Sequence, residues 1–101
     1  MSVLLLDVRT QAEYDRCHLP GARLIPTPLP PLTAEKYTNL GFRLLHVVQN
    51  VHPDTPIGVY CKKGIRAQAA VEILRHLGYH QTISLGGVDD PESLAGQICW
   101  G

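Results

Sequence analysis

Three short apolar runs, which alternate with helix-like segments, constrain the fold more than any other feature of the sequence. They cover residues 3–8 (VLLLDV), 57–60 (IGVY) and 82–85 (TISL). Runs of this length are typical of buried strands. Strands that alternate with helices favour an α/β fold with a mainly parallel central sheet. In such sheets ligands bind at the carboxyl ends of the strands, where Asp7 and Cys61 stand in this sequence.

Two predicted helices begin at threonine caps. Thr10 is followed three residues later by Glu13, and this capping box predicts a short helix over residues 11–16. Thr33 is the predicted N-cap of a longer helix that reaches about residue 51, because apolar residues recur there at helical spacing.

The rest of the chain carries weaker signals. Four prolines within residues 26–31 predict an extended connector, since proline removes a donor and fixes φ. A second short strand is expected at residues 24–25 and a small helix at 93–99. A third helix is predicted over residues 67–77 and ends at Gly78. Its expected inward residues are Ala67, Ala70, Val71, Leu74 and Leu77.

Length and charge narrow the class of protein. The 101 residues suit one domain with a modest core, so we expect a single domain over residues 1–101. The formal net charge is zero, which argues against a nucleic-acid or membrane partner. No apolar run approaches the roughly 20 residues of a membrane span, and the N-terminus lacks the basic start of a secretion signal. A cytoplasmic protein is therefore expected. The three cysteines form no CxxC pair, which argues against a zinc site.

The segment CKKGIR, residues 61–66, is the strongest candidate for a functional site. It places Lys62, Lys63 and Arg66 at the start of a predicted helix, where the helix dipole disfavours cations. Nearby anions would explain them. Backbone N–H groups of a tight loop and a helix N-terminus also stabilise anions. Gly64 permits a left-handed turn or a close ligand approach. The sequence therefore predicts a nucleophilic thiolate at Cys61 and an anionic substrate beside it.

Each of these residues also has a purely structural interpretation. Cys61 could be only a small buried side chain, with the two lysines a solvated helix start. Asp7 is expected to tie the first strand to neighbouring loops rather than to act as a base. Arg9 and Glu13 are expected to form a local ion pair. His18 is expected to be a hydrogen-bonded turn residue. Cys17 has two possible roles: a second thiol that reacts with oxidised Cys61, or a bystander.

Three motifs, in order along the chain, resemble the rhodanese family of sulfurtransferases. They are LLLDVRTQAEYDRCHLPGARLIP, VYCKKGIRA and ISLGG, and together they span most of the sequence. The loop is similar to the family form C-x-x-G-x-R. The resemblance implies a rhodanese-like fold, with a central mainly parallel sheet and helices on both faces. It implies no metal and no organic cofactor.

The resemblance also implies an activity. Cys61 would accept a sulfane sulfur as a persulfide and pass it to cyanide, a thiol or a protein thiol. The donor would be a small anion such as thiosulfate. Substrate-binding roles are implied for the rest of the loop, with Arg66 holding either the substrate or the loop itself. These loop residues are Lys62, Lys63, Gly64, Ile65 and Arg66. Structural support is implied for Asp7, Arg9, Glu13 and His18.

Three competing functions stay open. A phosphatase or arsenate reductase of related fold also uses a Cys…Arg loop, but its loop is one residue longer than the four residues between Cys61 and Arg66. A persulfide carrier would serve one protein thiol within a larger pathway. A rhodanese-like binding module would need no chemistry at all, although such modules often lose the loop cysteine that this chain keeps.

Overall fold

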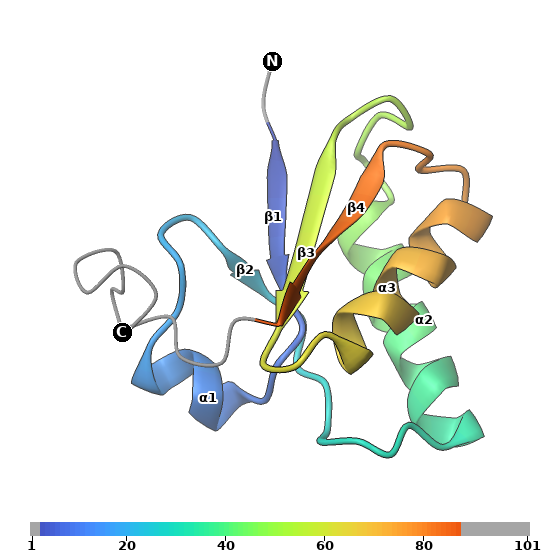
Figure 1. Cartoon of the computed structure of the whole chain (residues 1–101). Coiled ribbons are helices and arrows are strands. Elements are labelled where there is room, and N and C mark those ends of the chain that lie inside the picture. Colours follow the sequence, from blue (N-terminus) through green and yellow to red (C-terminus); the bar gives the residue numbers. More distant parts are fainter. Residues whose placement is uncertain (1–2, 88–101) are drawn as a thin grey trace.

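A computed structural model describes residues 3–87 and shows a four-stranded, all-parallel sheet with strand order β2-β1-β3-β4 (Figure 1). The α/β architecture expected from the sequence is confirmed. The elements in chain order are β1 (Leu4–Asp7), α1 (Gln11–Arg16), β2 (Arg23–Leu24), α2 (Ala34–Val48), β3 (Ile57–Cys61), α3 (Ile65–His76) and β4 (Thr82–Gly87).

The two faces of the sheet have different cores. Successive side chains on a strand point to opposite faces. On one face Leu6, Val59 and Cys61 join the main hydrophobic core with residues of α2 and α3. On the other face Tyr60 packs with Ala22, near α1 and the turn that follows it. Figure 1 shows α2 and α3 together on one side of the sheet and α1 on the other. Helices on both faces are therefore confirmed.

The predicted helix starts at Thr10 and Thr33 are confirmed by hydrogen bonds. The Thr10 hydroxyl accepts the Glu13 N–H at 3.2 Å, and the Glu13 carboxylate accepts the Thr10 N–H at 2.8 Å, so both halves of the capping box form. The Thr33 hydroxyl accepts the Lys36 N–H in the same way. These bonds satisfy N–H groups that a helix start leaves without an internal partner.

The third helix differs from its prediction at both ends. It begins at Ile65 instead of residue 67, because Gly64 takes a φ of +95° and turns the chain directly from the loop into the helix. At its other end Leu77 is 39 % exposed, so its predicted inward position is wrong. Gly78, with a φ of +100°, terminates the helix as expected.

Other limits shift by a few residues. The long helix α2 ends at Val48 rather than 51, and β4 continues to Gly87. The second strand is displaced by one residue, to Arg23–Leu24. No helix within residues 3–87 is long and apolar enough to cross a membrane. The small helix predicted at residues 93–99 lies outside the described part of the chain.

Candidate active site

Cys61 is the last residue of β3 and lies at the carboxyl end of the sheet, where the sequence predicts a ligand site. The residue is only 1 % exposed. Its Sγ atom accepts backbone N–H groups from Gly64 at 2.9 Å and from Ala67 at 3.3 Å. Ala67 belongs to the first turn of α3, so the sulfur also sits at the positive end of that helix. This arrangement stabilises negative charge on sulfur.

The loop of residues 61–64 is held from behind by the end of β4. A methyl group placed on Gly87 would lie 2.6 Å from Cα of Lys63 and 2.7 Å from the carbonyl oxygen of Lys62. Only glycine allows the strand to approach the loop this closely. The shape of the thiol loop therefore depends on Gly87, which lies 26 positions after Cys61 in the chain.

The cations of the loop divide into two kinds. Lys62 and Lys63 are exposed, and neither has an ion-pair partner among residues 3–87. The Arg66 side chain is only 3 % exposed. Its Nη1 and Nη2 atoms donate to the Glu13 carboxylate at 2.8 and 3.3 Å, and Nη1 also reaches the carbonyl oxygen of Thr27 at 3.4 Å. Arg66 therefore ties the loop to α1 and to the proline-rich connector.

Glu13 connects the helix cap to the loop. One carboxylate receives both the Thr10 N–H and the Arg66 guanidinium. Burial opposes the charged form of Glu13, but these hydrogen bonds and the charge of Arg66 outweigh it and lower the pKa of Glu13 from 4.5 to about 2. The ion pair predicted between Arg9 and Glu13 is wrong, because Arg9 pairs with Asp7 and Glu13 with Arg66.

Asp7, Arg9 and Tyr60 form a buried network beneath the site. The Arg9 guanidinium donates to both Asp7 oxygens at 2.7–3.1 Å, and the Tyr60 hydroxyl donates to Asp7 at 2.8 Å. Burial and the neighbouring Asp7 raise the pKa of Tyr60 above its usual range, so the hydroxyl keeps the proton that it donates. Burial opposes the charge on Arg9, yet its bonds to Asp7 outweigh this and raise its pKa. The network joins β1 to β3.

His18 lies apart from the thiol. Its ring stacks on Tyr14 with centroids 3.7 Å apart, and its Nδ1 atom is 2.9 Å from the Tyr14 carbonyl oxygen. The buried Cys17 offers its carbonyl oxygen to Arg9. Neither residue lines the thiol cavity. Within residues 3–87, no group of three or more His, Cys, Asp or Glu side chains could hold a metal ion.

A cavity of about 240 Å³ opens at the thiol. Its walls are the loop and the proline-rich connector, which supplies Leu29 and Pro30. A neighbouring cavity of about 230 Å³ lies beside α1, and Lys62 lines both. The remaining residues of the first cavity are Cys61, Lys62, Lys63, Ile65 and Arg66. Gly64 does not line this cavity, but its N–H contacts the Cys61 sulfur. All six loop residues proposed from the sequence, 61–66, therefore lie at the cavity or at the sulfur.

Sequence reasoning missed two parts of the site. Ala67 supplies an N–H to the sulfur, although alanine carries no side-chain signal and its place in the predicted helix indicates only a core position. The sequence predicts only a connector at Leu29 and Pro30. Four prolines in six positions do indicate a fixed, extended path, but nothing in the sequence shows that this path ends against the thiol loop.

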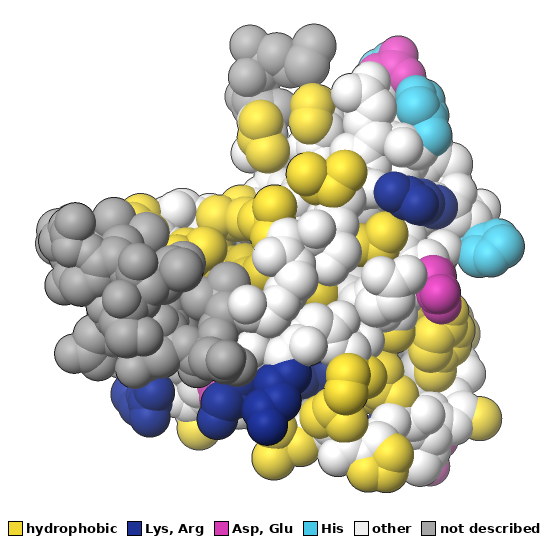
Figure 2. All heavy atoms as spheres, viewed as in Figure 1, with side chains coloured by type: hydrophobic (Ala, Val, Ile, Leu, Met, Phe, Trp, Pro, Cys, Tyr) yellow, Lys and Arg dark blue, Asp and Glu magenta, His cyan; other side chains and the backbone are white. Residues whose placement is uncertain are grey.

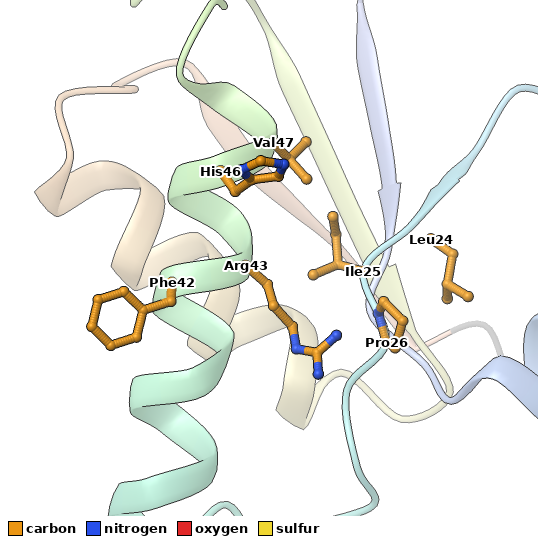
Figure 3. Close-up of a pocket in the computed structure, with 7 residues that line it drawn as sticks. All are labelled: Leu24, Ile25, Pro26, Phe42, Arg43, His46 and Val47. Carbon is orange, nitrogen blue, oxygen red and sulfur yellow. The ribbon is translucent and has the colours of Figure 1, made fainter.

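A further cavity of about 340 Å³ lies between α2 and the chain after β2 (Figure 3). Figure 3 shows Arg43 pointing from α2 toward Pro26, with Ile25 facing the helix. His46 adds an imidazole to this cavity, but no cysteine lines it. Of these two cavities, the smaller one is the one that Cys61 lines.

Comparisons with known proteins agree on one family. The model of the rhodanese-like domain matches residues 1–90. The chain is 43 % identical over 77 residues to the adenylyltransferase and sulfurtransferase MOCS3 of Sus scrofa, covering 73 % of this chain and 17 % of that protein. It is 28 % identical over 85 residues to a sulfurtransferase of Allochromatium vinosum, covering 84 % of this chain and 66 % of the relative.

A solved structure shows the same fold. A rhodanese from E. coli, determined with anions, is 27 % identical with a TM-score of 0.67, covering 88 % of this chain and 91 % of that one.

The probable adenylyltransferase/sulfurtransferase MoeZ of Mycobacterium tuberculosis is 32 % identical over 83 residues, which is 82 % of this chain. The chain spans less than a fifth of the length of MoeZ and MOCS3.

Proposed function

The chain belongs to the family of rhodanese-like domains, and on this premise we propose that it transfers a sulfane sulfur through a persulfide on Cys61. The observation that carries the proposal is the position of the Cys61 sulfur. It lies at the N-terminus of α3 and accepts two backbone N–H groups. Donors fixed in this way stabilise a thiolate without any rearrangement at the moment of reaction.

The proposed reaction has two balanced steps. The Cys61 thiolate attacks the outer sulfur of thiosulfate, the S–S bond to the sulfonate group breaks, and sulfite leaves with the electron pair. The persulfide of Cys61 then meets a nucleophile such as cyanide. The new bond forms to the terminal sulfur, thiocyanate leaves, and Cys61 returns as a thiolate. No external oxidant or reductant enters the cycle.

Thiosulfate is proposed as a donor because of Lys62 and Lys63. Both are exposed at the cavity, and neither has an ion-pair partner within residues 3–87. A dianion in the cavity would gain these two cations as counter-charges. The related rhodanese from E. coli was determined with anions, which is compatible with this proposal.

Arg66 is proposed as a positioning residue and not as a substrate ligand. Its guanidinium is buried and its donors are directed to Glu13 and Thr27. A phosphatase of related fold needs the loop arginine for its oxyanion. This use of Arg66, together with the short loop, favours sulfur transfer over phosphate ester hydrolysis.

Steady-state kinetics with thiosulfate and cyanide test the proposal. Formation of sulfite and thiocyanate in equal amounts, lost in Cys61→Ser, is the expected result. Hydrolysis of an aryl phosphate more efficiently than sulfur transfer would overturn it. Slow cyanide turnover with fast transfer to a protein thiol would assign the chain as a persulfide carrier. A single domain over residues 1–101 and a cytoplasmic location remain predictions from the sequence.

A further inference from the structure

The entrance to the thiol cavity combines exposed apolar side chains with exposed cations. Leu29 is 57 % exposed and Ile65 is 56 % exposed, and both line the cavity beside Cys61. Lys62 and Lys63 line the same cavity. At the lower edge of Figure 2, cationic side chains lie next to hydrophobic ones. A small inorganic anion needs the cations but gains little from two large exposed apolar groups.

The cationic part of the entrance reaches a second cavity that the apolar part does not reach. Leu29 and Pro30 belong to the proline-rich connector that follows β2. Lys62 faces the second cavity beside α1, which Leu29 and Ile65 do not line. A ligand that reaches the sulfur and also contacts the lysines and the exposed apolar side chains must therefore be larger than a free thiol. Such a ligand matches this entrance when it carries both negative charge and an apolar side chain.

We propose that the sulfur acceptor is a protein or peptide thiol whose cysteine lies between an acidic flank and an apolar flank. This inference rests on the proposed function. The acidic flank lies along Lys62 and Lys63, and the apolar flank contacts Leu29 and Ile65. Charge complementarity selects the acceptor, because the two lysines have no carboxylate partner within residues 3–87.

The transfer step needs no further reactant. The acceptor thiol gives its proton to solvent, and its thiolate attacks the terminal sulfur of the Cys61 persulfide. A new S–S bond forms on the acceptor, and the old S–S bond breaks with its electron pair on Cys61. The products are an acceptor persulfide and the Cys61 thiolate, so one sulfur atom has moved and no net oxidation has occurred.

The test uses short peptides with one central cysteine. The first has aspartates on one side and leucines on the other, in both chain orders, since either direction fits the surface. A second replaces aspartate by asparagine, a third replaces leucine by serine, and free cysteine serves as the small acceptor. The protein is loaded with thiosulfate and, in parallel, with inorganic polysulfide, which forms the persulfide without needing a donor site. Transfer from the preloaded protein is then followed by mass spectrometry.

The first peptide is expected to accept sulfur at least about tenfold faster than free cysteine, with each replacement peptide in between. Added salt should reduce the advantage of the aspartates only. Leu29→Ser should lower the ratio of the peptide rate to the cyanide rate. The matched control Ile83→Ser, at an equally exposed leucine-sized residue on β4, should leave that ratio unchanged.

Equal rates for all peptides and free cysteine would overturn the inference, as would a ratio that Leu29→Ser does not change. The test also distinguishes failure of the proposed function from failure of the acceptor inference. If thiosulfate does not load Cys61 but the polysulfide-loaded protein prefers the first peptide, the donor is wrong and the acceptor inference holds. If the loaded protein passes sulfur to no thiol and not to cyanide, both are wrong.

Discussion

The guanidinium of Arg66, at the start of α3, lies 2.8 Å from the carboxylate of Glu13 in α1, 53 residues earlier in the chain. The pair connects the Cys61 loop to a helix on the other side of the sheet. Glu13 also closes the capping box of that helix. The position of the thiol loop and the stability of α1 therefore depend on one carboxylate.

Replacing Glu13 by glutamine is expected to lower the free energy of unfolding by about 1–3 kcal/mol at pH 7, because buried Arg66 loses its charged partner. Glu13 has a lowered pKa, so its contribution is complete above pH 4.5 and is lost as the pH falls toward 2. Urea denaturation of both proteins at several pH values measures the difference. If the difference in unfolding free energy between the wild type and Glu13→Gln stays constant across this pH range, ionised Glu13 is not the source of the stability.

Replacing Gly87 by alanine is expected to displace the loop of Lys62 and Lys63, because the added methyl would lie within 2.6 Å of its backbone. Sulfur loading should slow by about tenfold or more while the circular dichroism spectrum is retained. The matched control is Gly41→Ala in α2, where a methyl meets nothing closer than 4.0 Å. That control should raise stability by about 0.5–1 kcal/mol and leave loading unchanged. Equal loading in both variants would remove Gly87 from loop positioning.

Replacing Tyr60 by phenylalanine removes the hydroxyl that donates to Asp7 and accepts the Leu19 N–H. We expect a loss of about 1–3 kcal/mol of unfolding free energy, since Asp7 is buried and the Leu19 N–H is partly buried. Thermal or urea unfolding measures this loss. Tyr37→Phe, at a partly exposed tyrosine of α2, should change stability by less than about 0.5 kcal/mol. Similar losses of unfolding free energy in the two variants would mean that the Tyr60 hydroxyl contributes no more to stability than the exposed one.

Replacing Lys62 and Lys63 together by alanine is expected to raise KM for thiosulfate by about tenfold, because a dianion loses two counter-charges. The salt dependence of KM should weaken at the same time. The control Arg43→Ala removes an exposed cation at the other cavity and should change neither quantity. If KM and its salt dependence stay unchanged in the double variant, the lysines do not bind the donor.

The fold was largely predictable, because short apolar runs, caps and terminators are local signals. The capping box of Thr10 and Glu13 and the terminator Gly78 formed as expected. The partners of Glu13 and Arg66 were not predictable in the same way. Arg9 lies four residues before Glu13 and is a plausible local partner, but the actual partner of Glu13 is 53 residues away. Such a pair is set by how the loop and α1 meet across the sheet, and spacing in one sequence does not encode it.

The site was predictable in its loop and not in its walls. Cys61 and its cations are adjacent in sequence, so their convergence needed only a turn. Leu29 reaches the cavity through the path of the connector. Gly87 lies against the loop backbone because of the register of β4 beside β3. Both positions follow from tertiary packing, which a local pattern does not specify.

The central claim, that Cys61 carries sulfur as a persulfide, is tested most directly by intact-protein mass spectrometry. The protein is incubated with thiosulfate, measured, and then treated with cyanide. We expect a gain of one sulfur, about 32 Da, that maps to Cys61, disappears with cyanide and is absent in Cys61→Ser. A gain that maps to another residue, or a Cys61→Ser protein that still loads sulfur, would contradict the account.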